Sequence, residues 1–275
     1  MSDLGHRSSA ASEQGMLATL AGGGRIWAVA AIHGEVRRLK LLHGRLERLL
    51  QPGDRLVYLG GYLGLGPSVI ETVDELLLFR RFFIARPDVP LESIVFLRGA
   101  QEEMWQKLLQ LQFAAAPAEV LRWMEAHGIG PTIAAYGGSV AEGLAAAAEG
   151  VVALTRWTSA LRQGMNRFDG HTQLMSSLKH AALTDDGSLL FVHAGVDPNR
   201  RVETQRDLYW WGHPAFETLA QPYDGFRLVV RGQAPNGPGL NVGDPVVTLD
   251  AGCGKGGPLM AACLEDGVVT QLVEG

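Results

Sequence analysis

The sequence predicts an α/β protein, because short apolar segments alternate with amphipathic segments of helical period along most of its 275 residues. Several apolar segments run directly into glycine-containing loops, as buried strands do when they end at a common sheet edge. Hydrophobic residues make up 47% of the chain, which excludes a wholly disordered polypeptide and allows a sizeable core. In α/β proteins binding and catalytic sites are built at the carboxyl ends of the strands, so we expect a site there.

The pattern begins at residue 25, after a Ser-, Ala- and Gly-rich segment, 1–24, that we predict to be a flexible tail. Apolar runs of strand length then alternate with stretches whose apolar residues recur every three to four positions. They predict, in order, a strand at Ile26–Ile32, a helix ending near Leu50, a strand at Arg55–Gly60, a helix over Ser68–Ala85 and a strand at Ser93–Arg98.

Residues 101–180 predict mainly helices, and the strand pattern resumes after them. We therefore interpret them as a helical cap inserted into one domain that spans residues 25–275. The predicted cap helices are Glu102–Gln112, Ala118–His127 and an Ala-rich stretch from Ser139 to Gly164. Further strands are predicted at Leu189–Val192, Arg227–Val230 and Val246–Leu249, and a hairpin at Pro258–Glu265 and Val268–Val273 around Asp266-Gly267.

The composition excludes several classes of protein. Lys and Arg number 24 against 29 Asp and Glu, and this net charge of −5 argues against a dedicated nucleic-acid binder. Two cysteines are too few for a disulfide framework or a Cys-rich zinc site. No stretch approaches the roughly 18 apolar residues of a membrane span, and the N-terminus lacks the pattern of a signal peptide. We expect a cytoplasmic protein with neither nucleic acid nor membrane as a partner.

The loops after the predicted strands carry an ordered series of motifs. In chain order they are Ala30-Ala31-Ile32-His33-Gly34, Gly60-Gly61-Tyr62-Leu63-Gly64-Leu65-Gly66, Gly99-Ala100-Gln101-Glu102, His193-Ala194-Gly195, Gly232-Gln233-Ala234-Pro235 and Leu249-Asp250-Ala251-Gly252-Cys253. This series resembles the calcineurin-like metallophosphoesterases, in particular the bacterial serine/threonine protein phosphatases and diadenosine tetraphosphatases. The resemblance covers about residues 25–275. It implies a four-layer sandwich of two mixed β-sheets flanked by helices, with the cap as an insertion.

The resemblance also implies where two divalent metals, such as Mn, Fe or Zn, would bind to activate a hydroxide for attack on phosphorus. His33 and His193 are the metal-ligand positions that this sequence retains, one from each metal subsite. Ala31 stands where the family has the Asp of the first metal, and Gly61 where it has the Asp that bridges both. Two neutral imidazoles without a bridging carboxylate do not make a dinuclear centre.

The remaining family positions are replaced as well. Ala100 and Gln233 stand at the Asn and the later His of the second metal. Gln101 occupies the position of the general-acid His, while Leu65 and Gly64 occupy those of a phosphate-binding Arg and the neighbouring Asp. We therefore expect no catalytic residue of the inherited mechanism and no metal cofactor. We expect these residues to line a vestigial pocket with Ala31, His33, Gly61 and His193.

These departures favour a pseudophosphatase, which would bind an unidentified partner protein or a phosphorylated ligand. The alternative is an active metal-dependent phosphatase with a rearranged or mononuclear site, acting on a phosphoprotein or on a nucleotide phosphoester or phosphoanhydride. In that alternative His33 and His193 share one ion, such as Zn²⁺, with Glu35, Glu102 or water. A purely structural subunit of a larger complex is a third hypothesis.

Other candidate side chains have ordinary structural interpretations. Glu102 and Glu103 open a predicted helix, where carboxylates favour the positive end of the helix dipole. The tryptophans are expected to be buried, and the histidines near the cap to be surface or hydrogen-bonded core residues. Cys253 matches the cysteine of the family's closing motif and is not expected to be a nucleophile.

Overall fold

The structure is a computed structural model that describes residues 16–237 and 239–275. Its strands form two mixed sheets, a five-stranded sheet of order β11-β10-β2-β3-β4 and a six-stranded sheet of order β1-β5-β6-β7-β9-β8. The strands are β1 (Leu17–Leu20), β2 (Arg25–Val29), β3 (Arg55–Tyr58), β4 (Ile94–Phe96), β5 (Ala181–Thr184), β6 (Leu189–Val192), β7 (Leu228–Arg231), β8 (Asn241–Val242), β9 (Val246–Thr248), β10 (Met260–Glu265) and β11 (Val268–Glu274).

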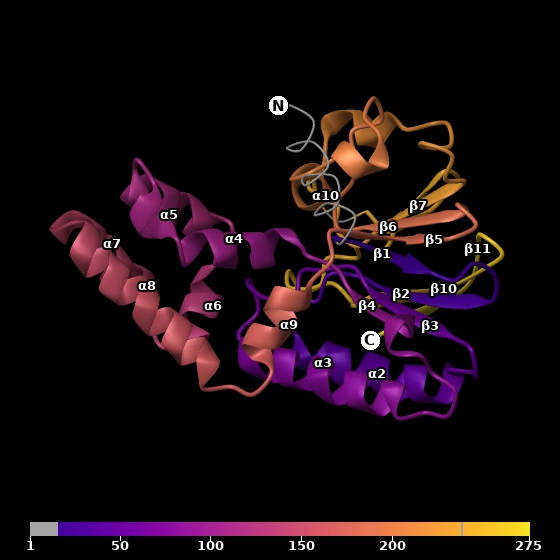
Figure 1. The fold of residues 1–275 in the computed structure, drawn as a ribbon, viewed down its shortest axis with the longest axis horizontal. Coiled ribbons are helices and arrows are strands. Elements are labelled where there is room, and N and C mark those ends of the chain that lie inside the picture. Colours follow the sequence, from indigo (N-terminus) through magenta and orange to yellow (C-terminus); the bar gives the residue numbers. More distant parts are fainter. Residues whose placement is uncertain (1–15, 238) are drawn as a thin grey trace, which may run out of the picture.

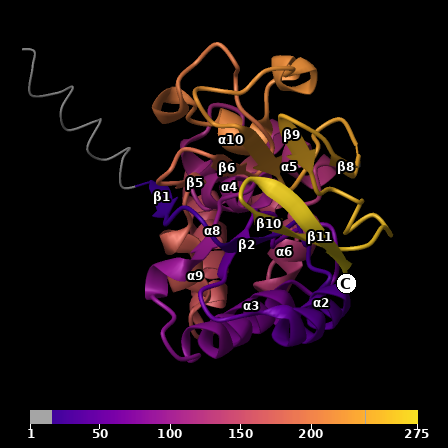
Figure 2. The same cartoon turned by 90° about the vertical axis from the view of Figure 1, so that its right-hand side faces the viewer.

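Helices flank the two sheets, as expected. The α-helices are α2 (Val36–Leu49), α3 (Val69–Ile84), α4 (Ala100–Leu108), α5 (Pro117–Ala126), α6 (Gly130–Ala135), α7 (Val140–Glu149), α8 (Val151–Asn166), α9 (His171–Ser177) and α10 (Leu208–Trp211). In Figure 1, α2 and α3 cover the outer side of the five-stranded sheet, and α10 lies with its neighbouring loops beyond the six-stranded sheet. Figure 2, turned by 90°, shows the same order of layers.

Two apolar clusters hold these layers together, and β6 contributes to both. Leu189 and Phe191 of β6 belong to the large cluster that includes the five-stranded sheet, α2 and α3. Leu190 and Val192 belong to a smaller cluster with Trp210 of α10. Both faces of the strand are therefore buried, which explains why its sequence is a continuous apolar run rather than an alternation.

The segment between β4 and β5 is helical, from α4 to α9, and in Figure 1 its helices α4 to α8 extend away from the sheets. The Ala-rich stretch forms two helices rather than one. Gly150, with φ 119°, separates α7 from α8, and Ser139 caps α7 by accepting a hydrogen bond from the Glu142 N–H at 3.2 Å. A φ of this sign is available to glycine but strained for other residues, so the helix ends there.

The prediction of a flexible tail over residues 1–24 is wrong for Leu17–Leu20. Leu17–Leu20 form β1, which pairs in parallel with β5, while residues 1–15 lie outside the described part. Backbone pairing to β5 stabilises these four residues, although their sequence alone is too short to stand out as a strand. The C-terminal hairpin is confirmed, with β10 and β11 antiparallel. No α-helix in the described ranges combines the length and the hydropathy required to cross a membrane.

Candidate functional site

The carboxyl ends of parallel strands from both sheets meet at one edge of the molecule. β2, β3 and β4 are parallel in one sheet, and β6 and β7 are parallel in the other. The Ala31 N–H, after β2, donates to the Gly232 carbonyl after β7 at 3.1 Å, so the two sheets are joined at this edge. We call the nine residues Ala31, His33, Gly61, Gly64, Leu65, Ala100, Gln101, His193 and Gln233 the strand-end cluster.

The two histidines of the strand-end cluster face the same small space. A Cβ atom placed on Gly61 would lie 2.9 Å from Ala31 Cβ, 3.2 Å from His193 Cε1 and 3.3 Å from His33 Cε1. His193 Nδ1 bonds to the Leu59 carbonyl oxygen at 2.8 Å, so Nδ1 is the protonated nitrogen and Nε2 an acceptor. His193 Nε2 and His33 Nδ1 are buried and have no hydrogen-bond partner among the described residues.

Glu102 is the carboxylate that organises this edge. Its Oε2 accepts the N–H of Gly61 at 2.8 Å and of Gly99 at 2.9 Å. Its Oε1 accepts the N–H of Tyr62 at 2.8 Å and of Leu63 at 3.1 Å. The predicted role at a helix start is confirmed, since Glu102 lies in the first turn of α4. The same side chain also binds the loop after β3, a contact that the sequence did not predict.

The cap covers the part of the cluster that contains Gln101. Gln101 is buried, and its Nε2 donates to the His127 carbonyl after α5 at 2.7 Å. A Cβ on Gly64 would collide with the Gln101 amide, so Gly64 makes room for this side chain. The Leu65 N–H donates to the Gly128 carbonyl at 3.0 Å, which ties the same loop to the cap.

Gln233 and Ala100 complete the cluster. The Gln233 N–H donates to the His193 carbonyl at 2.9 Å, and its Oε1 is buried with no partner among the described residues. Ala100 is the first residue of α4, directly after Gly99. The sequence predicted a pocket lined by these nine residues. None of them lines any of five cavities of about 290–370 Å³ on the described surface, and His33 and His193 are only 4% and 0% exposed.

Burial dominates the electrostatics of the two histidines. It lowers the pKa of His33 from 6.5 to about 4, with a further lowering from neighbouring His193 and an opposing effect of Asp250. Burial also lowers the pKa of His193, against the opposing charge of Glu102. Both imidazoles are therefore neutral at pH 7.

These shifts predict a loss of stability in mild acid. The unfolded chain takes up a proton on His33 near pH 6.5, and the folded chain does so only near pH 4. The contribution of neutral His33 to the free energy of unfolding is therefore fully present above pH 6.5 and decreases as the pH falls toward 4. From pH 7.5 to 5.5 we expect His33 to lower the free energy of unfolding by about 1 kcal/mol.

Urea unfolding at the two pH values measures this effect. His33→Asn should remove it, because Asn cannot titrate there and tolerates the positive φ of 55° at this position. The difference between His33→Asn and the parent chain isolates the contribution of His33. An unaltered pH dependence in His33→Asn would contradict the assignment.

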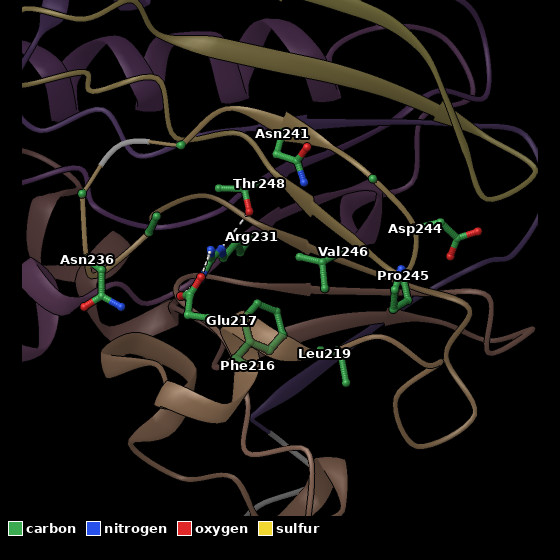
Figure 3. A pocket seen from close by; sticks show the side chains of 14 residues that line it. Phe216, Glu217, Leu219, Arg231, Asn236, Asn241, Asp244, Pro245, Val246 and Thr248 are labelled. Atoms are coloured by element: carbon green, nitrogen blue, oxygen red, sulfur yellow. Dashed lines mark hydrogen bonds and ion pairs between the residues drawn. The ribbon is translucent and has the colours of Figure 1, made fainter.

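A polar cavity of about 360 Å³ lies on the six-stranded sheet beyond the cluster (Figure 3). Arg231, at the end of β7, bonds to Glu217 through Nη1 at 2.7 Å and Nη2 at 2.9 Å, and to Thr248 through Nε at 2.9 Å. The Arg231 guanidinium lies over the Phe216 ring, 5.1 Å from its centroid. Hydrogen bonds from Arg231 lower the pKa of Glu217. The Arg231 guanidinium is hydrogen-bonded to Glu217 and Thr248 of the same chain, so this arrangement stabilises the wall of the cavity.

The other candidates divide between buried and exposed. His171 is buried and bonds to Tyr136 at 2.9 Å and Asp74 at 3.1 Å, as expected of a core histidine. Burial raises the pKa of Cys253 to about 12, which does not suit a nucleophile. The prediction that the tryptophans are buried is wrong for two of them, because Trp123 and Trp211 are 45% and 36% exposed.

No family model matches the sequence, and no curated protein matches it either. Solved structures do. A crystal structure described as a putative diadenosine tetraphosphatase aligns with a TM-score of 0.52 and 20% identity, covering 94% of this chain and 97% of that one. A cold-active protein tyrosine phosphatase aligns with a TM-score of 0.50 and 14% identity, covering 96% and 80%. The chain has the metallophosphoesterase fold.

The metallophosphoesterase fold explains why the two sheets converge at the strand-end cluster. At 14–20% identity the similarity shows the fold alone. The chemistry of the site is therefore inferred from the residues of the strand-end cluster. Sequence reasoning located the loops correctly at strand ends. It missed the bonds of Glu102 to the three N–H groups after β3 and the contact of Gln101 with the cap, because these bonds join residues far apart in the chain.

Proposed function

We propose that this protein is a pseudophosphatase, a metallophosphoesterase fold that acts by binding a partner protein and does not hydrolyse phosphoesters by the two-metal mechanism. The observation that carries the proposal is the make-up of the strand-end cluster. Its two imidazoles meet beside Ala31 and Gly61, neither of which offers a ligand atom in its side chain.

The donor chemistry of the cluster does not fit two hard divalent ions. Such sites use carboxylate oxygens and usually at least three protein ligands per ion. Glu102, a carboxylate beside the cluster, already accepts four backbone N–H groups. Within residues 16–237 and 239–275, no three His, Cys, Asp or Glu side chains are grouped so that they could hold a metal ion. The residues of the strand-end cluster therefore do not fit a two-metal centre.

Exposed aromatic side chains near the cluster support a binding role. Trp123 of α5 and Trp211 of α10 meet edge to face, with ring centroids 5.7 Å apart. His127 stacks on Trp123 at 4.1 Å, and its carbonyl holds Gln101 of the cluster. Tryptophan is enriched where proteins bind one another, because it offers a large apolar area and a hydrogen-bond donor.

Metal content and turnover of the purified chain test the proposal. We expect less than one equivalent of Mn, Fe or Zn per chain after incubation with these ions and dialysis. Hydrolysis of p-nitrophenyl phosphate should stay at the level of the double variant His33→Asn, His193→Asn. Stoichiometric metal together with turnover that His33→Asn abolishes would establish the active alternative instead.

A further inference from the structure

A cavity of about 370 Å³ lies between α4, α8 and α9, apart from the side chains of the strand-end cluster. Figure 1 shows these three helices on the cap side of the molecule. The volume falls within the range of about 300–1,000 Å³ that is usual for small-molecule sites. α8 and α9 are consecutive in the chain, whereas α4 precedes them by more than 40 residues.

The floor of the cavity is apolar and adaptable. It is formed by Trp105, Leu109, Met165, Met175 and Leu178. Trp105, Met165 and Leu178 are buried. Methionine side chains are flexible and polarizable, so two of them allow the floor to adjust to an aliphatic or aromatic body.

The wall of the cavity carries two arginines. Arg162 of α8 is exposed and forms no ion pair within the described part of the chain, and its Nη2 donates to the Leu109 carbonyl at 3.0 Å. Arg98 Nη1 pairs with Glu103 at 2.9 Å. Glu102 also lines the cavity, but four backbone N–H groups surround its carboxylate. The cation available to a ligand is therefore Arg162.

Two buried donors of the lining residues lack partners. Trp105 is only 2% exposed, and its Nε1 has no hydrogen-bond partner within residues 16–237 and 239–275. The Nε of Arg98 is buried and unpartnered in the same part of the structure. Buried N–H groups without partners are costly, so each such group calls for an acceptor.

We propose that this cavity binds a small amphipathic carboxylate, such as a medium-chain fatty acid. The apolar body lies against Trp105 and the methionines, and the carboxylate faces the Arg162 guanidinium, whose planar fork matches its geometry. The site shares no ligand-binding group with the strand-end cluster, so it stands whether or not the cluster binds metal.

Calorimetric titration of the full chain with hexanoate, octanoate and decanoate tests the proposal. We expect saturable 1:1 binding that tightens about fourfold for each added methylene group, the increment of burying one CH₂. Octylammonium, which carries the opposite charge on the same chain, should bind at least about tenfold more weakly than octanoate. Equal affinity for the two ions, or no saturable octanoate binding at millimolar concentration, overturns the proposal.

Variants locate the site. Arg162→Met retains the apolar stem and should weaken octanoate binding about tenfold, as expected for loss of a charge-assisted contact. Arg156→Met, at an exposed position of the same helix that does not line the cavity, is the matched control and should bind as the parent does. Met175→Trp fills the cavity and should abolish binding while the thermal midpoint shows that the chain is folded. Unchanged octanoate affinity in both Arg162→Met and Met175→Trp refutes this location.

Discussion

Replacement of Glu102 by Ala is expected to lower the free energy of unfolding by about 3–5 kcal/mol. The carboxylate is 3% exposed and accepts four backbone N–H groups from the loops after β3 and β4. The truncated side chain leaves those donors buried without acceptors. Glu102→Gln should be intermediate, because its amide retains one acceptor oxygen and turns its NH₂ group toward donors. Urea unfolding at pH 7.5 measures both variants.

Glu142 provides a matched control for Glu102. It occupies the same third position in the first turn of α7, where its Oε2 accepts the Ser139 N–H at 2.8 Å in an exposed capping box. Water replaces that bond when the side chain is removed, so Glu142→Ala should cost about 1 kcal/mol or less. Similar losses in the two variants would show that Glu102 acts as an ordinary helix cap and does not hold the β3 loop.

Replacement of Gly61 by Asp is expected to lower the free energy of unfolding by about 2–4 kcal/mol. Gly61 has φ 71°, a left-handed conformation that glycine adopts freely and Asp adopts at a cost. That Cβ would also lie 2.9 Å from Ala31 Cβ, closer than such atoms pack. We further expect Gly61→Asp to take up no metal, because Ala31 and Ala100 of the strand-end cluster have no ligand atom in their side chains.

Gly53→Asp separates the two contributions to the Gly61 effect. Gly53 has φ 84°, but a Cβ there would meet no atom within 4 Å. Its substitution should therefore show the backbone cost alone, about 1–2 kcal/mol. Chemical unfolding of the two variants and elemental analysis of Gly61→Asp give the comparison. Stability of Gly61→Asp equal to that of Gly53→Asp, or better, would show that the cluster has room for a carboxylate at position 61.

The elements predicted best are those whose sequence pattern matches their burial. β6 is predicted to the residue as Leu189–Val192, since both of its faces are buried and its run is wholly apolar. The hairpin around Asp266-Gly267 is confirmed because Asp266 and Gly267 adopt the positive φ that its turn requires. β1 was missed because its four residues depend on pairing with β5, more than 150 positions further along the chain. Non-local pairing leaves no periodic signal in so short a segment.

The sequence by itself determined the α/β class, the helical character of the segment between β4 and β5, and the glycine-containing loops that end the central strands. Those features depend on local hydrophobic period and on glycines at turns, which are written in neighbouring residues. Only the tertiary structure decided that Glu102 binds N–H groups from two loops, that Gln101 and Gly64 close the cluster against the cap, and that Arg162 and Trp105 share a cavity. Apart from the bond between Gly99 and Glu102, these contacts join residues tens of positions apart, and such contacts arise from packing and not from any local pattern.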